Sequence, residues 1–258
     1  KLKNKSSKTY LMFQLLKKQK TWLLTGTPLE NNLQDVVSLF RFMSKDILSD
    51  PNDYLKIKNE IKPFIKRRMK KDVAKELPDL IEQEVLLDLS PQQKTEYTQI
   101  YENRENYDSM FEVLNDLKQV CNFSNKNKTS SKLEMLELII EEVYENKGKI
   151  LVFSQYVETL IEIEKKLKFQ NVNIFHGGLN QDEKNTIIEN FKNTDEPSAM
   201  LISIKAGSVG LNLQEASTVV LFDRWWNPAI ENQAIGRAHR IGSKEPVTAY
   251  KFLVRDTV

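Results

Sequence analysis

Residues 150–154 read Ile150-Leu151-Val152-Phe153-Ser154, a nearly continuous apolar run that ends in a hydroxyl. Comparable short apolar runs recur at 172–175, 199–203, 218–222 and 247–253, and amphipathic helix patterns lie at 133–145, 157–168, 181–192 and 229–241. Such runs are typical of strands buried on both faces, so their alternation with helices predicts an α/β fold with a parallel sheet covered on both sides. In sheets of this kind the functional residues lie on loops beyond the carboxyl ends of the strands.

The sequence before residue 132 has a different pattern. A helix is predicted over 9–18, a short buried strand over 22–24 and a second helix over 33–43. Residues 44–131 are highly charged and rich in helix signals, and Pro51, Pro63, Pro78 and Pro91 interrupt them. We therefore expect three parts: 1–43 as the end of one domain, 44–131 as a helical linker with protrusions, and 132–258 as the α/β domain.

The composition narrows the function classes. The 38 basic and 36 acidic residues give a net charge of +2, so any interaction with a polyanion must come from local sites. The single cysteine, Cys121, excludes an internal disulfide and a cysteine-clustered zinc site, which is typical of a reducing compartment. The apolar runs are far shorter than a membrane span. We predict neither a metal site nor a membrane partner.

Polar residues and glycines gather where the predicted strands end. Ser154 and Gln155 follow the first of these strands, and Trp225 and Trp226 follow the fourth. The loop after the third contains Lys205, Ala206, Gly207, Ser208, Gly210 and Asn212. Backbone amides beside glycines can approach a phosphate closely, although the glycines can equally serve only the geometry of a turn. Adjacent tryptophans point in different directions, so at least one is expected near the surface.

A group of polar side chains is expected on the last helix. Gln233, Arg237 and Arg240 are spaced at i, i+4 and i+7, which would place them on one helix face. Guanidinium groups suit bidentate contact with phosphate oxygens. The alternative is a solvated basic face that pairs with Glu231 or Glu245.

Two upstream stretches also hold candidate residues. Thr25, Gly26 and Thr27 form a turn that places two hydroxyls after the predicted strand at 22–24, where they could sense a phosphate or hold a domain contact; a simple turn explains them equally well. Residues 66–71 form the strongest local basic cluster. A solvated charge run is the usual explanation for such a cluster, and contact with DNA phosphates is the other.

Together these stretches resemble the Swi/Snf branch of the second helicase superfamily, over nearly the whole chain. Residues 24–31 are similar to its third helicase motif, 152–155 to the fourth, 205–213 to the fifth and 233–242 to the sixth. The tryptophan pair followed by Asn227 and Pro228 is similar to a segment largely particular to this branch. The chain departs from the family pattern at Arg224, often proline, at Ser208, often glycine, and at residues 123–124, usually histidine-proline.

The resemblance implies a motor of two RecA-like lobes that binds ATP between them and moves along duplex DNA without fully separating its strands. Residues 1–43 would end the first lobe and 132–258 would form the second. Arg237 and Arg240 would be arginine fingers, and Gln233, Gly210 and Asn212 would bind ATP. The implied DNA-binding residues are Ser154, Gln155, Lys205, Ala206, Gly207, Ser208, Trp225 and Trp226, and the implied coupling residues are Thr25, Gly26 and Thr27.

The resemblance also sets expectations about cofactors and partners. ATP and magnesium would serve the full-length protein, but the 258 residues contain neither a Gly-x-x-x-x-Gly-Lys-Thr loop nor an acidic magnesium-binding box, which in the family lie upstream. We expect this chain by itself to hold no cofactor and to hydrolyse no ATP. Expected partners are double-stranded DNA, the missing first RecA-like lobe and a DNA-bound protein. The lack of large insertions favours a bacterial, nucleoid-associated cytoplasmic protein, with the nucleus as the alternative.

Three other function classes fit parts of the sequence. A strand-separating helicase shares the lobe and the arginine helix, but the tryptophan pair and the linker helices argue against it. In a non-enzymatic binding module the lobe would hold nucleic acid or a partner without using ATP. A phosphate loop encoded upstream of these residues in the full gene would exclude this class. A dinucleotide-binding oxidoreductase would need a Gly-x-Gly-x-x-Gly sequence after the first strand, and none is present.

Overall fold

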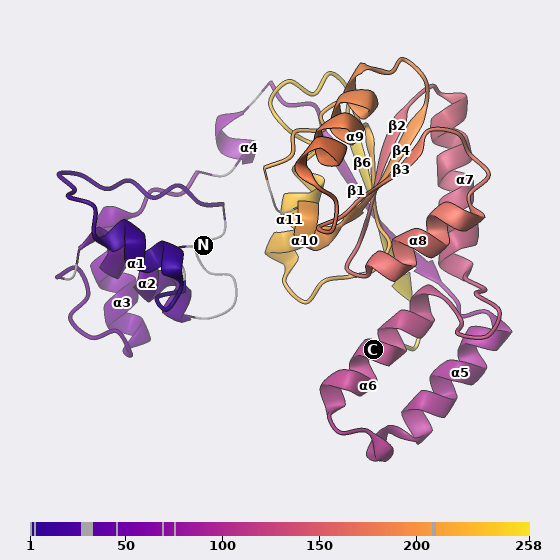
Figure 1. Ribbon diagram of the computed structural model, residues 1–258, viewed down its shortest axis with the longest axis horizontal. Helices are drawn as coiled ribbons and strands as arrows, with labels where there is room; N and C mark the ends of the chain where they lie inside the picture. Colours follow the sequence, from indigo (N-terminus) through magenta and orange to yellow (C-terminus); the bar gives the residue numbers. More distant parts are fainter. Residues whose placement is uncertain are drawn as a thin grey trace. The chain divides into compact units, whose positions relative to one another are not determined.

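The computed structural model describes residues 2, 4–26, 33–44, 46–68, 70–74, 76–207 and 210–258. The chain forms two compact units, residues 1–75 and 76–258 (Figure 1). The first unit is helical, with α1 (Lys8–Gln14), α2 (Leu33–Met43), α3 (Tyr54–Ile61), the 3-10 helix η1 (Lys62–Phe64) and α4 (Lys70–Val73). No helix in the described ranges is both long and apolar enough to cross a bilayer.

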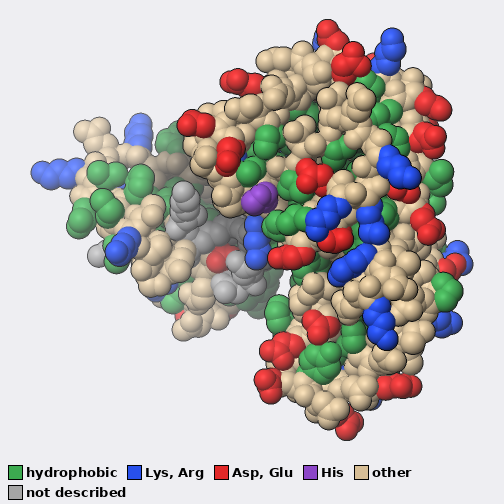
Figure 2. Space-filling model, turned by 45° about the vertical axis from the view of Figure 1, so that its right-hand side comes forward, with side chains coloured by type: hydrophobic (Ala, Val, Ile, Leu, Met, Phe, Trp, Pro, Cys, Tyr) green, Lys and Arg blue, Asp and Glu red, His purple; other side chains and the backbone are tan. Residues whose placement is uncertain are grey.

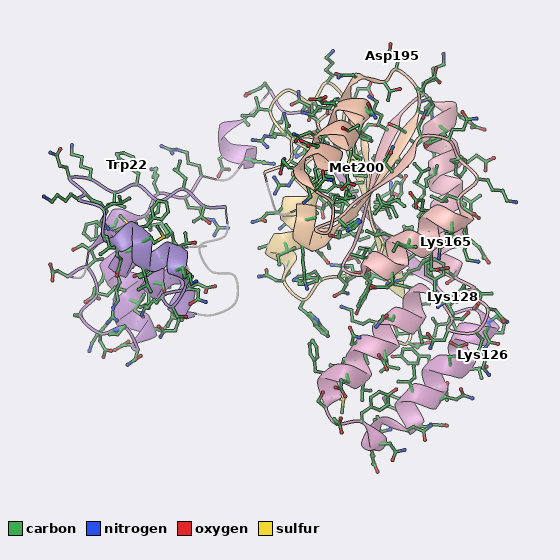
Figure 3. The ribbon with its side chains drawn as sticks, viewed as in Figure 1. Trp22, Lys126, Lys128, Lys165, Asp195 and Met200 are labelled. Carbon is green, nitrogen blue, oxygen red and sulfur yellow. The ribbon has the colours of Figure 1, made fainter. Side chains whose placement is uncertain are left out.

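The first unit confirms one prediction and corrects another. Helix α2 has the predicted bounds, and its Val36, Val37 and Phe40 pack on Leu48 and Ile57. The strand predicted over 22–24 is wrong: these residues adopt no regular structure, and the Trp22 side chain is 85% exposed (Figure 3). A strand needs a neighbour for its backbone hydrogen bonds, and the described residues of this unit contain no other strand.

The second unit is built on a six-stranded sheet in the order β1-β6-β5-β2-β4-β3, in which every neighbouring pair is parallel. The strands are β1 (Leu80–Leu87), β2 (Lys149–Ser154), β3 (Val172–Phe175), β4 (Ser198–Ser203), β5 (Thr218–Leu221) and β6 (Val247–Val254). Phe153 lies opposite Ile202 and Leu221 in the register, so β2, β4 and β5 end at one edge of the sheet. The predicted parallel α/β fold is confirmed.

Helices cover both faces of the sheet because alternate strand residues point to opposite sides. Leu151 and Phe153 belong to the core cluster under α9 (Gln181–Asn193), α10 (Ile204–Gly207) and α11 (Pro228–Ile235). Ile150 and Val152 belong to the cluster under α7 (Ser131–Glu145) and α8 (Val157–Lys166). Figure 1 shows the two groups of helices on opposite sides of the strands.

Strand β1 lies within the range expected to be helical. It pairs with β6 along its whole length, from Leu80 opposite Val247 to Leu87 opposite Val254. Most of its side chains are exposed because it is an edge strand, and its centre carries Glu82 and Glu84. A half-polar strand lacks the continuous apolar run that is typical of buried strands, so the hydrophobic pattern of the sequence does not predict β1. The division into parts at residues 43 and 131 stays a prediction.

A helical hairpin projects from the carboxyl-end side of the sheet (Figure 1). It consists of α5 (Pro91–Glu102), the short 3-10 helix η2 (Arg104–Asn106) and α6 (Met110–Asn122). A capping box between Ser90 and Gln93 starts α5. The buried Gln93 amide also donates to the Val120 carbonyl (2.8 Å), so the base of the hairpin is fixed. Val113 and Leu117 of α6 are buried.

Candidate functional site

The loops after β2, β4 and β5 meet at the carboxyl edge of the sheet, as the sequence predicts. Their described residues are 154–156, 204–207, 210–213 and 222–227. The loop after β5 leads into α11, which Asn227 caps by accepting the Ala229 amide N–H (2.9 Å). The site is therefore assembled from segments far apart in the sequence.

Asp223 is the centre of a buried polar network at this edge. Its side chain is 2% exposed and accepts hydrogen bonds from the Ser154 hydroxyl, the Gln155 backbone N–H (3.0 Å) and the Asn122 side-chain amide (3.2 Å). Ser154 is itself fully buried, and its hydroxyl also accepts the Tyr156 N–H (3.1 Å). A contact between the Ser154 hydroxyl and DNA would require these bonds to open.

Lys132 extends this network into the protein interior. It is 4% exposed, and its ammonium donates to the Asn122 side-chain oxygen (2.9 Å). Burial lowers the pKa of Lys132, while the negative charge of Asp223 acts in the opposite direction. Asn122 thus bridges a buried ammonium and a buried carboxylate, which satisfies both groups away from water.

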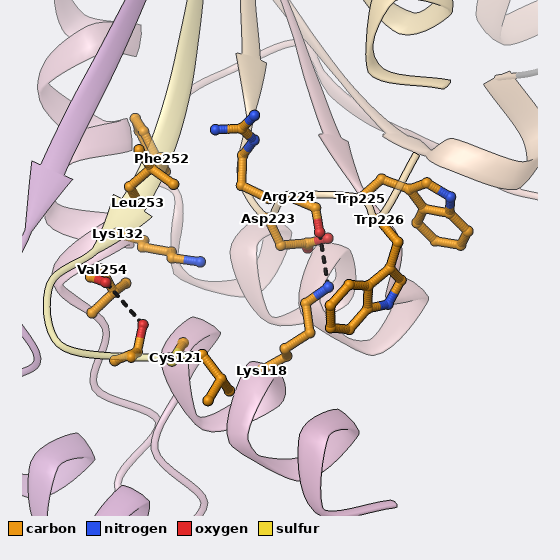
Figure 4. A pocket seen from close by; sticks show the side chains of 12 residues that line it. Lys118, Cys121, Lys132, Asp223, Arg224, Trp225, Trp226, Phe252, Leu253 and Val254 are labelled. Carbon is orange, nitrogen blue, oxygen red and sulfur yellow. Dashed lines mark hydrogen bonds between the residues drawn. The ribbon is translucent and has the colours of Figure 1, made fainter. Parts of the chain in front are cut away.

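Helix α6 fastens two of the edge loops through one face. Asn115, Lys118 and Asn122 are spaced so that they share that face. Asn115 accepts from the Tyr156 hydroxyl (3.1 Å), and the Lys118 ammonium donates to the Arg224 carbonyl (2.8 Å). Figure 4 shows this last bond at the side of a pocket of about 280 Å³. The helical hairpin and the loops at the carboxyl ends of the strands are therefore held as one structure.

The two tryptophans lie in different environments, which confirms that one of them is at the surface. Trp225 is partly buried against the core, whereas Trp226 is 62% exposed and has the Lys118 ammonium 4.4 Å from its ring centre (Figure 4). The Trp226 ring thus has the Lys118 ammonium near it and remains accessible to solvent.

Arg224, the departure from the family's proline, forms a bidentate ion pair. Its Nε and Nη2 atoms lie 2.9 and 3.1 Å from the two carboxylate oxygens of the buried Glu231. Hydrogen bonding to Glu231 raises the pKa of Arg224. Glu231 also accepts the Trp225 N–H (2.9 Å), so the pair fixes the loop to α11. Glu231, one of the two carboxylates that the alternative interpretation offers to the basic face, is bound by Arg224.

Helix α11 ends earlier than predicted, so the expectation of one helix face for Gln233, Arg237 and Arg240 is wrong. The helix stops at Ile235, and Gly236 donates to the Asn232 carbonyl (2.9 Å) as the chain tightens into turns. The Ser243 hydroxyl then donates to the Ala238 carbonyl (2.7 Å) and holds the turn in place. Gln233 is on the helix, and the two arginines follow it in the turns.

Arg237 joins this turn segment to the loop after α10. Its guanidinium donates to the Leu211 carbonyl (3.3 Å), and its own carbonyl accepts the Leu213 N–H (3.0 Å). Burial lowers the pKa of Arg237, and the positive charge of Arg240 lowers it further. Two neighbouring guanidiniums, of which Arg240 is exposed, create a local positive potential suited to an anion.

The same junction contains a polar atom suited to a ligand. The Asn212 side-chain oxygen is buried and has no hydrogen-bond partner within the described residues. A buried acceptor without a donor costs free energy, so it is a candidate for contact with a bound molecule. Gly210 next to it has φ +31°, and the space above its Cα is open. The predicted nucleotide-binding residues therefore lie beside the arginine segment.

The predicted DNA-contacting loop is only partly at the surface. Lys205 is exposed, but Ala206 and Gly207 are buried. A Cβ on Gly207 would lie 3.1 Å from the Phe153 ring, so this glycine serves packing under the loop. Gln155 has a buried side-chain nitrogen without a hydrogen-bond partner among the described residues. Ser208 and Thr27 lie outside the described residues, and Thr25 and Gly26 belong to the first unit.

Within the described ranges, no group of three or more histidine, cysteine, aspartate or glutamate residues is placed to hold a metal ion. The part of the chain that the structure describes thus offers no cluster of three or more such ligands to a magnesium ion.

Comparison with known proteins defines the class of the α/β unit and then its family. The helicase conserved C-terminal domain matches residues 131–242, so the sheet is a RecA-like lobe of helicase type. The SNF2-related domain matches residues 1–145, more than half of the chain. The chain therefore belongs to the SNF2-related family of ATP-dependent helicases and remodellers.

Individual relatives cover the whole chain. It is 34% identical over 286 residues to an uncharacterized ATP-dependent helicase of Mycoplasma genitalium, and 30% identical over 302 residues to the human chromodomain-helicase-DNA-binding protein 1. The alignments span 100% of the chain but 28% and 18% of these relatives, so the chain matches less than a third of their length. The Sulfolobus solfataricus SWI2/SNF2 ATPase core, solved in complex with double-stranded DNA, is 30% identical, with a TM-score of 0.58 over 98% of this chain and 61% of that one.

Proposed function

We propose that this chain is the C-terminal part of an ATP-driven motor that moves along double-stranded DNA. In this proposal the α/β unit supplies arginine fingers to a nucleotide held mainly by another lobe, and its edge loops hold the DNA backbone. Family membership supports the use of ATP, and the duplex bound to the Sulfolobus relative supports duplex DNA as the track.

The observation that carries the proposal is the junction between Arg237 and the Leu211 and Leu213 backbone. It holds a guanidinium pair beside the unpartnered Asn212 oxygen, at the sheet edge where α/β folds bind ligands. A positive pair in this position can stabilise the charge that develops on a transferring phosphoryl group. In this proposal Gln233 and Gly210, together with Asn212, contact the nucleotide.

We assign the DNA side to the neighbouring loops. Lys205 is exposed and can contact a phosphate, Trp226 offers an accessible ring, and the Gln155 side-chain nitrogen is a buried donor without a described partner. Trp225, Ala206 and Gly207 contribute by supporting these loops from below, and Ser154 by orienting Asp223. Contacts of this kind position the backbone without reading the sequence.

We further propose that these 258 residues do not hydrolyse ATP by themselves. Phosphoryl transfer needs a phosphate cradle and a metal site in addition to arginine fingers, and the sequence contains no phosphate loop. The first lobe would supply both, with Thr25, Gly26 and Thr27 coupling it to the cleft.

Replacing Lys205 by alanine tests the DNA side. The substitution removes one phosphate contact, so duplex binding should weaken to the same extent on unrelated sequences, and the slope of log affinity against log salt should fall by about one. Fluorescence anisotropy with labelled duplexes over a salt series measures both quantities.

Lys168→Ala is the matched control. Lys168 is an exposed lysine in the loop before β3, at the amino ends of the strands, whereas Lys205 follows the carboxyl end of β4. Equal losses in the two variants, or an unchanged salt slope for Lys205→Ala, would refute the assignment of this loop to DNA.

A further inference from the structure

The free end of the helical hairpin exposes large apolar side chains. We call residues 101–112 the hairpin tip. Tyr101 is 49% exposed, Met110 60% and Phe111 73%, although the same helices bury Val113 and Leu117 at their mutual contact. Clustered apolar surface of this kind on a soluble domain marks an interaction site. None of these three side chains belongs to the core clusters of the α/β unit.

The tip is also acidic, in contrast to the chain as a whole. Residues 101–112 contain four acidic side chains and one basic, whereas the whole chain carries +2. Glu102, Glu105, Asp108 and Glu112 are all exposed. Figure 2 shows acidic side chains around apolar ones at the lower end of the molecule, where the hairpin lies. Such a surface repels nucleic acid phosphates and attracts a basic partner.

Local contacts keep the tip ordered before any partner binds. The one basic side chain, Arg104, contacts Tyr101: it donates to the Tyr101 carbonyl (2.8 Å) and lies 4.5 Å from the centre of the Tyr101 ring. The Tyr107 hydroxyl donates to Asp116 (3.3 Å), and Ser109 caps α6 by accepting the Glu112 N–H (3.3 Å). A preformed surface loses less conformational entropy on binding than a flexible loop does.

We propose that the hairpin tip is a docking site for a basic segment of another protein, one that inserts an apolar side chain beside Met110 and Phe111 while its lysines or arginines face the acidic rim. The tip exposes both features that such a segment would contact. Its apolar side chains offer area that the partner can bury, and its carboxylates can orient and attract a basic partner. This inference does not depend on the arginine or DNA assignments above. It gives the motor a contact with protein that is separate from its DNA-binding edge.

The test uses a short labelled peptide of alternating lysine and leucine as the probe, with a lysine–serine and a glutamate–leucine peptide as comparisons. We expect the lysine–leucine peptide to bind the 258-residue chain, and the other two to bind at least about tenfold more weakly. The double variants Met110→Ser with Phe111→Ser, and Glu105→Lys with Asp108→Lys, should each weaken lysine–leucine binding by about tenfold or more. All four positions are exposed, so the fold should persist, and circular dichroism checks this.

Matched controls lie on α7. Leu138→Ser removes a 60% exposed apolar side chain, and Glu141→Lys with Glu145→Lys reverses two exposed charges; neither should change binding. Equal effects of the α7 and tip variants would overturn the proposal, because the probe would then be reporting net charge. It would also be overturned if sedimentation showed the tip variants abolishing self-association of the chain while leaving peptide binding unchanged, because the occupant would then be a second copy.

Discussion

Replacing Arg237 by alanine, in a longer protein that joins this chain to a lobe with a phosphate loop, is expected to reduce duplex-stimulated ATP turnover by about a thousandfold or more. The guanidinium is held at the Leu211 carbonyl and lies next to the charge of Arg240, so it is positioned to stabilise negative charge in the transition state. Steady-state turnover at saturating ATP and DNA measures the effect. Lysine at this position keeps the charge but loses the planar fork, so Arg237→Lys should restore little activity.

Arg255→Ala is the control for this experiment. Arg255 is a 56% exposed arginine whose ion pair with Asp88 is long (3.6 Å), and it lies outside the segments assigned to ATP or DNA. Turnover should be unchanged in this variant. Duplex affinity should be retained in Arg237→Ala, which separates a loss of catalysis from a loss of folding. If Arg237→Ala keeps most of its turnover, Arg237 is not an arginine finger.

The largest stability effect is expected for Asp223→Ala. The substitution leaves the buried Ser154 hydroxyl without its acceptor and takes from the Asn122 amide one of its two acceptors, the other being the Thr159 hydroxyl. It also removes the carboxylate that opposes the burial of the Lys132 charge. Removing one partner of such a buried charged network costs about 3–5 kcal/mol. Urea unfolding followed by circular dichroism measures the change in the free energy of unfolding.

The matched control is Asp195→Ala, at an exposed aspartate in the loop between α9 and β4, on the opposite side of the α/β unit (Figure 3). We expect a change within about 0.5 kcal/mol there. Adding Lys132→Met to Asp223→Ala should recover part of the loss, because the buried ammonium is then removed as well. A loss for Asp223→Ala no larger than that for Asp195→Ala would contradict the network.

The buried part of the fold was predictable because its signal is local. Strands β2, β4 and β5 are nearly continuous apolar runs, and β3 and β6 are mostly apolar. The predicted ends of these five strands lie within one residue of the observed ends. Strand β1 was not predicted, because an edge strand with Glu82 and Glu84 has no such run. The end of α11 differs from the prediction for another reason: Ala234, Ile235 and Ala238 are all buried, so the apolar spacing of a helix continues past the actual helix end at Ile235.

The candidate site was predictable as a set of loops, but its internal bonding was not. Helicase-like motifs pointed to the segments around Gly210 and Arg237, yet the Ser154–Asp223 and Asn122–Asp223 bonds join residues 69 and 101 positions apart. A single sequence contains no pattern that indicates hydrogen bonds between residues so far apart. A weak signal existed in Lys132, a lysine in the first turn of a helix whose Leu133 and Leu136 face the core, and in Asp223, an aspartate directly after a buried strand.

The most direct test of the proposed motor is ATP hydrolysis with and without duplex DNA, compared between the 258-residue chain and a longer protein that also contains the phosphate-loop lobe. We expect the chain by itself to be inactive and the longer protein to be stimulated by duplex. DNA-stimulated turnover by the 258-residue chain, or a longer protein that responds to single strands and ignores duplex, would contradict it.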